Sequence, residues 1–227
     1  EDYASILYLS NSDFEGGEFL VIPNNISLRI PIHMAFNTSE FLYEKASFKY
    51  FPNLHLAKRE KPETIEINIT VFYNSNIENS FKEANMILDI LGKDVVTIIP
   101  DPTINDIKCV SKGTSIVHIV THQKNGKIIF KDHNINTTEL VNVFPENLEL
   151  AVLNICKGGE IMEKSDYPID HKGLVHGLLE KNVKKIITNS WDLGQEASYD
   201  FSKAFYNNLM KTKNLNRFPL VLKNRPP

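Results

Sequence analysis

Two near-continuous apolar runs in the middle of the chain constrain its fold more than any other feature. They cover residues 115–122, which end at His122, and residues 148–156, which end at Cys156. Strands buried on both faces of a parallel sheet read as uninterrupted Val, Ile and Leu runs, and the loops after their carboxyl ends build ligand sites. The sequence therefore predicts a parallel sheet in which an imidazole and a thiol emerge at the same edge.

The distance between these two side chains depends on a strand order that periodicity does not reveal. Two neighbouring strands lie about 5 Å apart, and two strands separated by a third lie about 10 Å apart. Short loops can close either gap. We therefore interpret His122 and Cys156 as a candidate catalytic dyad.

Strand and helix patterns alternate from residue 65 onward. Further strand-like runs cover residues 65–73, 95–99 and 185–191, and helical spacing of apolar residues covers 81–91, 171–181 and 196–210, with a capped helix start at 136–140. The helical stripes comprise Phe81, Ala84, Ile87, Leu88 and Leu91 in one helix, and Ala197, Phe201, Ala204, Phe205 and Leu209 in another. This alternation predicts an α/β fold whose mostly parallel sheet is covered by helices on both faces.

A charged connector at residues 58–63 suggests a division of the chain. We predict a small strand-rich part at 1–62, with strand-like runs at 18–22 and 28–30, followed by the main α/β part at 63–227. Because the chain begins without Met, we interpret it as a fragment of a longer protein.

Bulk properties exclude several classes of function. A net charge of −3 argues against a nucleic-acid-binding surface, and no apolar stretch approaches the roughly 18 residues of a membrane span. The chain has only two cysteines, Cys109 and Cys156, which fits a reducing compartment. We expect a cytoplasmic protein without nucleic-acid or membrane binding.

The succession of motifs resembles the CHAT domain, a caspase-like module related to separase. The blocks that carry the resemblance, in order, are IVTH at 119–122, VLNICKGGE at 152–160, GLVHGLL at 173–179, IITNSWD at 186–192 and FYNNL at 205–209. Residues 20–25, 29–32 and 50–54 also resemble the family's amino-terminal strands and connector. The tail at 214–227 departs from the family's closing helix.

The resemblance implies a caspase-like fold and cysteine-dependent cleavage of a protein substrate through an acyl-enzyme. His122 would be the base and Cys156 the nucleophile. Linked sensor or repeat domains, or an activating partner, commonly switch such modules on, often in bacterial defence or signalling. Neither a cofactor nor a metal is implied.

The chemistry of thiol attack adds requirements that individual residues can meet. A free thiol with a pKa of about 8.5 is only a few per cent thiolate at neutral pH, so an imidazole must take its proton. Backbone N–H groups must then bind the oxyanion, a role that Gln123, Gly158 and Gly159 can fill. Caspase-like enzymes usually have Gly where this chain has Gln123, and a side chain there restricts the backbone angles.

Substrate selection is a further role for the residues after the last strand. Asp192 could bind a basic side chain and Trp191 could form a wall of the groove, although an Asp at this point often caps the next helix. Outside these positions, we interpret Cys109 as a small structural hydrophobe and His118 as a satisfied residue of the core or of a sheet face. We place His171 and His176 near the solvent side of their helix.

Two other interpretations remain open. The first, which the presence of Gln123 in place of Gly supports, is a catalytically silent caspase-like scaffold that binds partners through the same groove. An unrelated doubly wound ligand-binding domain would instead have His122 and Cys156 far apart.

Overall fold

The computed structural model describes residues 18–21, 47–50, 66–124, 127–132, 134–155, 174–189 and 194–213. The chain divides into two compact units, one formed by 1–61 with 218–227 and the other by 62–217. In the first unit, β1 (Glu18–Val21) and β2 (Ser47–Tyr50) form a two-stranded parallel sheet. The expected strand at 28–30 lies outside the described residues.

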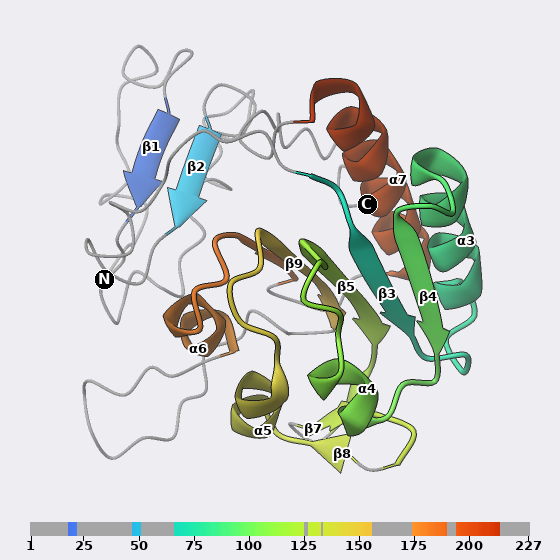
Figure 1. Ribbon diagram of the computed structural model, residues 1–227, viewed down its shortest axis with the longest axis vertical. Coiled ribbons are helices and arrows are strands. Elements are labelled where there is room, and N and C mark those ends of the chain that lie inside the picture. Colours follow the sequence, from blue (N-terminus) through green and yellow to red (C-terminus); the bar gives the residue numbers. More distant parts are fainter. Residues whose placement is uncertain are drawn as a thin grey trace, which may run out of the picture. The chain divides into compact units, whose positions relative to one another are not determined.

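The second unit is built on a five-stranded sheet with the order β10-β9-β5-β3-β4 (Figure 1). The strands are β3 (Ile69–Tyr73), β4 (Val96–Pro100), β5 (Ile116–Thr121), β9 (Leu150–Ile155) and β10 (Ile186–Thr188). Each neighbouring pair is parallel. The predicted parallel sheet is therefore confirmed, and the two apolar runs form β5 and β9, two adjacent strands among its three inner ones.

Helices cover both faces of this sheet, as predicted. They are α3 (Ser80–Leu91), α4 (Ile104–Lys108), α5 (Thr137–Val143), α6 (Leu174–Glu180) and α7 (Gln195–Thr212). In Figure 1, α3 and α7 pack together on one face, and α4, α5 and α6 lie on the other. None of the helices in the described ranges is long and apolar enough to cross a bilayer.

Local sequence signals explain where two of these helices begin. The predicted capped start at residues 136–140 is confirmed, because the side chain of Asn136 accepts the N–H of Glu139 and the carboxylate of Glu139 accepts the N–H of Asn136. Thr103 and Asp106 form the same reciprocal pair at the start of α4. Each pair satisfies two backbone donors that a helix start otherwise leaves unpaired.

The two faces of the sheet have different chemistry. Phe72, Ile119 and Leu153 occupy matching positions on β3, β5 and β9, and they belong to the apolar core shared with α4, α5 and α6. The alternate positions, Val71, His118 and Val152, face α3 and α7. A fully buried histidine therefore lies in the middle of the second face.

A small antiparallel sheet follows β5 directly and was missed by the sequence interpretation. It has the order β6-β7-β8 and consists of β6 (Gln123–Lys124), β7 (Lys127–Ile129) and β8 (Asn134–Ile135). Its first strand contains Gln123, so this sheet sets the backbone conformation just after His122.

The buried faces of α3 and α7 differ from their predicted stripes. In α3, Phe81 is 60% exposed, Leu88 is half-buried, and Glu83 is only 2% exposed. In α7, Ala204 is exposed, and the buried face consists of Ser198, Ser202, Phe205, Tyr206 and Leu209. The stripes are confirmed in part, since Ala84, Ile87 and Leu91 of α3 and Phe205 and Leu209 of α7 are buried. The prediction missed that polar residues which bond to one another share these buried faces.

Candidate active site

The two strands that lead to the candidate dyad are direct neighbours. β5 and β9 pair in parallel from Ile116 opposite Leu150 to Thr121 opposite Ile155. Thr121 is followed in the chain by His122, and Ile155 by Cys156. Cys156, Gly158 and Gly159 lie outside the described residues, so their predicted roles stay predictions.

His122 is half-buried at the carboxyl edge of the sheet. It lines a small pocket of about 40 Å³ that reaches down between β5, β9, α3 and α7. Asn154, Asn189 and Gln195 line the same pocket, together with Glu83. The candidate base thus opens onto a pocket whose lining is rich in amide and carboxylate side chains.

The backbone of Gln123 is oriented by its pairing with β7. The N–H of Ile129 donates to the C=O of His122 at 3.0 Å, and Gln123 lies opposite Ile128. Residues of an antiparallel strand bond to the partner alternately, so Gln123 directs its N–H and C=O away from β7. Gln123 has the extended backbone of a strand, a conformation that does not require Gly.

Glu83 is the centre of a buried hydrogen-bond network below the small pocket. Its Oε1 accepts the Nε2–H of His118 at 3.0 Å, an Nδ2–H of Asn154 at 2.5 Å and the hydroxyl of Ser202 at 2.6 Å. Its Oε2 accepts the hydroxyl of Ser198 at 3.3 Å. One side chain of α3 is thereby joined to β5, β9 and α7.

These donors keep the Glu83 carboxylate ionised. Burial by itself raises the pKa of Glu83, but the hydrogen bond and charge of His118, with the donors from Ser202 and Asn154, outweigh it and lower the pKa below 4.5. An ionised carboxylate only accepts, so the Nε2 of His118 carries a hydrogen.

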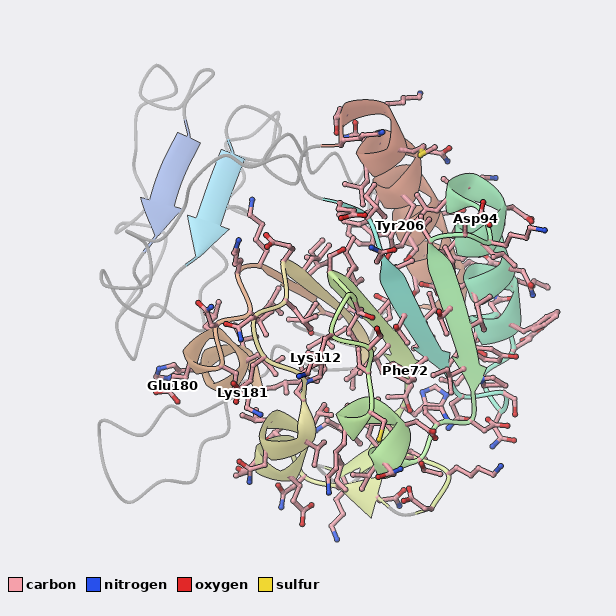
Figure 2. All side chains as sticks on the ribbon, viewed as in Figure 1. Phe72, Asp94, Lys112, Glu180, Lys181 and Tyr206 are labelled. Carbon is pink, nitrogen blue, oxygen red and sulfur yellow. The ribbon has the colours of Figure 1, made fainter. Side chains whose placement is uncertain are left out.

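Tyr206 closes the other end of this chain of hydrogen bonds. Its hydroxyl lies 2.9 Å from Nδ1 of His118, and the two rings are 5.7 Å apart. Figure 2 shows Tyr206 on α7, on the side of the sheet opposite α4 and α5. Burial, together with the charge of Glu83, raises the pKa of the Tyr206 phenol well above 10.0, so this hydroxyl stays protonated.

A larger pocket of about 310 Å³ lies on the other side of the end of β5. Asn74, Ser75 and Asp101, from the ends of β3 and β4, line it with Thr121 and Lys131. The backbone N–H and the hydroxyl of Ser75 donate to the two carboxylate oxygens of Asp101, at 2.7 and 2.8 Å. These bonds, with the charge of Lys131, lower the pKa of Asp101.

The remaining site predictions had mixed outcomes. His171, Trp191 and Asp192 lie outside the described residues. His118 is a hydrogen-bonded core residue, as predicted, and His176 is partly exposed on α6 beside Glu180. The interpretation of Cys109 as a buried hydrophobe was wrong, because this thiol is exposed at the end of α4.

Sequence reasoning missed Glu83, the residue on which the polar network depends. Its partners on α7, Ser198 and Ser202, gave a usable signal, because they recur with Tyr206, a partner of His118, at a four-residue spacing that places three polar groups on one face of a helix. Within the described residues, no group of three or more His, Cys, Asp or Glu side chains could hold a metal ion.

The family model described as the CHAT domain matches residues 9–217 of the 227. The chain belongs to the CHAT domain family. This family is related to caspase-like peptidases, so the interpretation as an unrelated ligand-binding domain is set aside. No curated protein matches the chain.

Two solved structures are weakly similar in shape. A short-chain flavodoxin associated with a bacterial microcompartment is 14% identical with a TM-score of 0.35, covering 65% of this chain and 99% of its own. A flavodoxin from the domain Archaea is 12% identical with a TM-score of 0.30, covering 64% and 98%. TM-scores this low support no inference about this CHAT domain.

Proposed function

We propose that this CHAT domain is a cysteine endopeptidase that hydrolyses peptide bonds of a protein substrate. His122 is the general base and Cys156 the nucleophile. The reaction passes through a thioester acyl-enzyme.

The observation that carries the proposal is the register of β5 and β9. Their last residues, Thr121 and Ile155, are paired, and the next residue of each chain is a member of the dyad. Paired strands lie about 4.8 Å apart, so continuing this register by one residue would bring an imidazole beside a thiol on the same face. A one-residue slip would send the two side chains to opposite faces.

The proposed steps use groups that the chain supplies. His122 takes the thiol proton of Cys156, and the thiolate attacks the substrate carbonyl carbon. The oxyanion is bound by backbone N–H groups, for which the N–H of Gln123 and those near Gly158 and Gly159 are the candidates. The C–N bond breaks as His122 returns the proton to the leaving amine, and water activated by His122 then hydrolyses the thioester.

The residues after β10 are the proposed specificity elements. Asn189, which follows β10, lines the small pocket beside His122. Trp191 and Asp192 come two and three residues later in the chain. We propose Asp192 as the group that binds a basic substrate side chain and Trp191 as a wall of the groove.

Labelling with a thiol-reactive peptide probe tests the nucleophile directly. The exposed thiol of Cys109 would also react, so the full-length protein is used in a Cys109→Ser background. We expect labelling and substrate cleavage in this background, loss of both in Cys156→Ala, and a loss of cleavage on the order of 10²-fold or more in His122→Ala. Cleavage that survives Cys156→Ala would refute the nucleophile, and an unreactive Cys156 in the activated protein would favour a silent scaffold.

Control by linked domains or a partner is part of the same proposal. It rests on the family, whose modules are commonly switched on by sensor or repeat domains in bacterial defence or signalling. We expect the full-length protein to cleave substrate only after its activating signal. Cleavage by the full-length protein without that signal, at the same rate as by the isolated domain, would argue against such control.

A further inference from the structure

A single oxygen atom connects the two strands that lead to the proposed dyad. Oε1 of Glu83 accepts hydrogen bonds from His118 on β5 and from Asn154 on β9. His118 lies four residues before His122, and Asn154 two residues before Cys156. The contact therefore joins the two strands close to the point where each ends.

The network lies on the face of the sheet that the base also uses. Val120 is paired with Asn154, and side chains alternate along a strand, so His118, Val120 and His122 share a face with Asn154. His122, Asn154 and Glu83 line the same small pocket. The carboxylate thus lies under the site rather than in a remote part of the core.

Helix α7 completes the arrangement and restricts the movement of Asn154. The amide of Asn154 donates to Glu83 and also to the hydroxyl of Ser202, at 3.2 Å. Ser202 in turn donates to Glu83 and is fully buried. Three side chains from three different elements therefore hold one another in a closed ring of hydrogen bonds.

Burying a carboxylate has a large desolvation cost, and apolar residues of the same volume often stabilise a core as well or better. The opposite face of this sheet is packed with apolar side chains. What a fully bonded polar network adds is a fixed geometry, since its members have one arrangement that satisfies all donors.

We propose that Glu83 is a positioning residue that fixes the spacing and register of the strand ends carrying His122 and Cys156. The inference rests on the proposed function. A misplacement of about 1 Å between reacting groups can cost on the order of 100-fold in rate. Loss of Glu83 therefore lowers kcat, whereas KM, which reflects substrate contacts, stays nearly constant.

The central test compares Glu83→Ala, Glu83→Gln and a control for lost stability. Glu83→Ala is expected to lower kcat by about 10- to 100-fold. Glu83→Gln keeps an acceptor at Oε1 and places its amide beside Ser198, whose hydroxyl can accept, so kcat is expected to stay within about fivefold of wild type. Ile107→Ala opens a cavity in the core of the opposite face, and the folded enzyme is expected to keep its kcat.

A carboxylate–amide exchange keeps the proposal falsifiable if Glu83→Ala fails to fold. Asn154→Asp alone places two carboxylates within hydrogen-bond distance and is expected to lower kcat at neutral pH by about as much as Glu83→Ala. Adding Glu83→Gln removes the repulsion and restores an amide donor, so kcat in the double variant is expected to rise at least about fivefold above Asn154→Asp. Strict additivity of the two changes would overturn the proposal.

Two outcomes of the first comparison would also overturn it. One is an unchanged kcat in Glu83→Ala, and the other is an equal fall in kcat in Ile107→Ala. If the wild type shows no turnover that depends on Cys156, the proposed function fails instead. The alkylation rate of Cys156 by iodoacetamide, in the Cys109→Ser background, still tests positioning, and it is expected to change severalfold in Glu83→Ala; an unchanged rate would overturn the inference.

Discussion

The two faces of the central sheet differ in the polar groups that they bury. On one face, β3, β5 and β9 pack Phe72, Ile119 and Leu153 against α4, α5 and α6, and none of the buried ionisable side chains of the described residues lies on this face. On the other, α3 and α7 bury the carboxylate of Glu83 and the imidazole of His118. Apolar burial stabilises in proportion to area and tolerates small shifts, whereas a hydrogen-bond network tolerates little displacement.

This difference coincides with the proposed chemistry. His122 lines the small pocket above the polar face, next to Glu83 and Asn154. The apolar face is thus expected to determine how stable the domain is, and the polar face how its strand ends are aligned. Substitutions that change one face at a time test that division of roles.

The largest loss of stability is expected on the apolar face. Phe72 is fully buried near the carboxyl end of β3 and is marked in Figure 2. Phe72→Ala removes a ring and leaves a cavity, which costs about 3–5 kcal/mol of unfolding free energy. Urea unfolding at neutral pH measures this loss. A cost below about 1 kcal/mol would mean that the apolar face is not the main source of stability.

Glu83→Ala should cost somewhat less, and its cost should depend on pH. Removing the carboxylate leaves His118, Asn154 and Ser202 without their acceptor, at a cost of about 3 kcal/mol near neutral pH. The pKa of Glu83 is lowered in the folded state, so its contribution is present above pH 4.5 and disappears as the pH falls through the folded pKa. Among the described residues, the other titratable groups that face it are His118 on β5 and Tyr206 on α7, and His122 lines the same small pocket.

Unfolding of wild type and Glu83→Ala at pH 7 and again well below pH 4.5 measures this dependence. The difference between the two proteins should shrink in acid. For Phe72→Ala, whose lost group does not titrate, the difference from wild type should stay nearly constant. A difference for Glu83→Ala that is the same at both pH values would show that its charge contributes nothing to folding.

The strands of the central sheet could be predicted from the sequence, but the buried polar network around Glu83 could not. The runs at residues 115–122 and 148–156 became β5 and β9, because buried strands have a recognisable composition. Their adjacency was not readable, since strand order depends on contacts between distant segments. The burial of Glu83 was not predicted because a carboxylate on a helix is normally exposed. Its burial is possible only because partners on three other elements donate hydrogen bonds to it.

The small sheet after His122 was not predicted for a different reason, which is the shortness of its strands. Strands β6 and β8 have only two residues each, too few for an alternating pattern to show. The pair Asn125 and Gly126 between β6 and β7 was nevertheless a hairpin signal that the sequence interpretation overlooked. The predicted dyad, which depends on Cys156, remains to be tested by the labelling experiment.

A smaller effect is expected where α5 and α6 approach closely on the apolar face. A Cβ atom on Gly177 would lie 2.7 Å from a methyl group of Val141, whose branched side chain has little rotamer freedom in a helix. Gly177→Ala should therefore cost about 1–3 kcal/mol through overpacking. Val141→Ala in the same chain makes room for the added methyl group, so the double variant should be more stable than the sum of the single changes predicts. Additive costs would mean that the two helices simply move apart.

The smallest effect distinguishes the end of the polar network from its centre. Tyr206→Phe removes one hydroxyl bonded to His118 but keeps the ring packed at 4.9 Å from Phe205, so it should cost about 1 kcal/mol at neutral pH. Because the pKa of Tyr206 is raised in the folded state, wild type should lose stability as the pH rises above 10.0, where the unfolded phenol ionises first. Tyr206→Phe lacks that part of the loss, so the two unfolding free energies should converge in alkali. If Tyr206→Phe lost as much unfolding free energy at neutral pH as Glu83→Ala, the network would depend on the tyrosine hydroxyl as much as on the carboxylate.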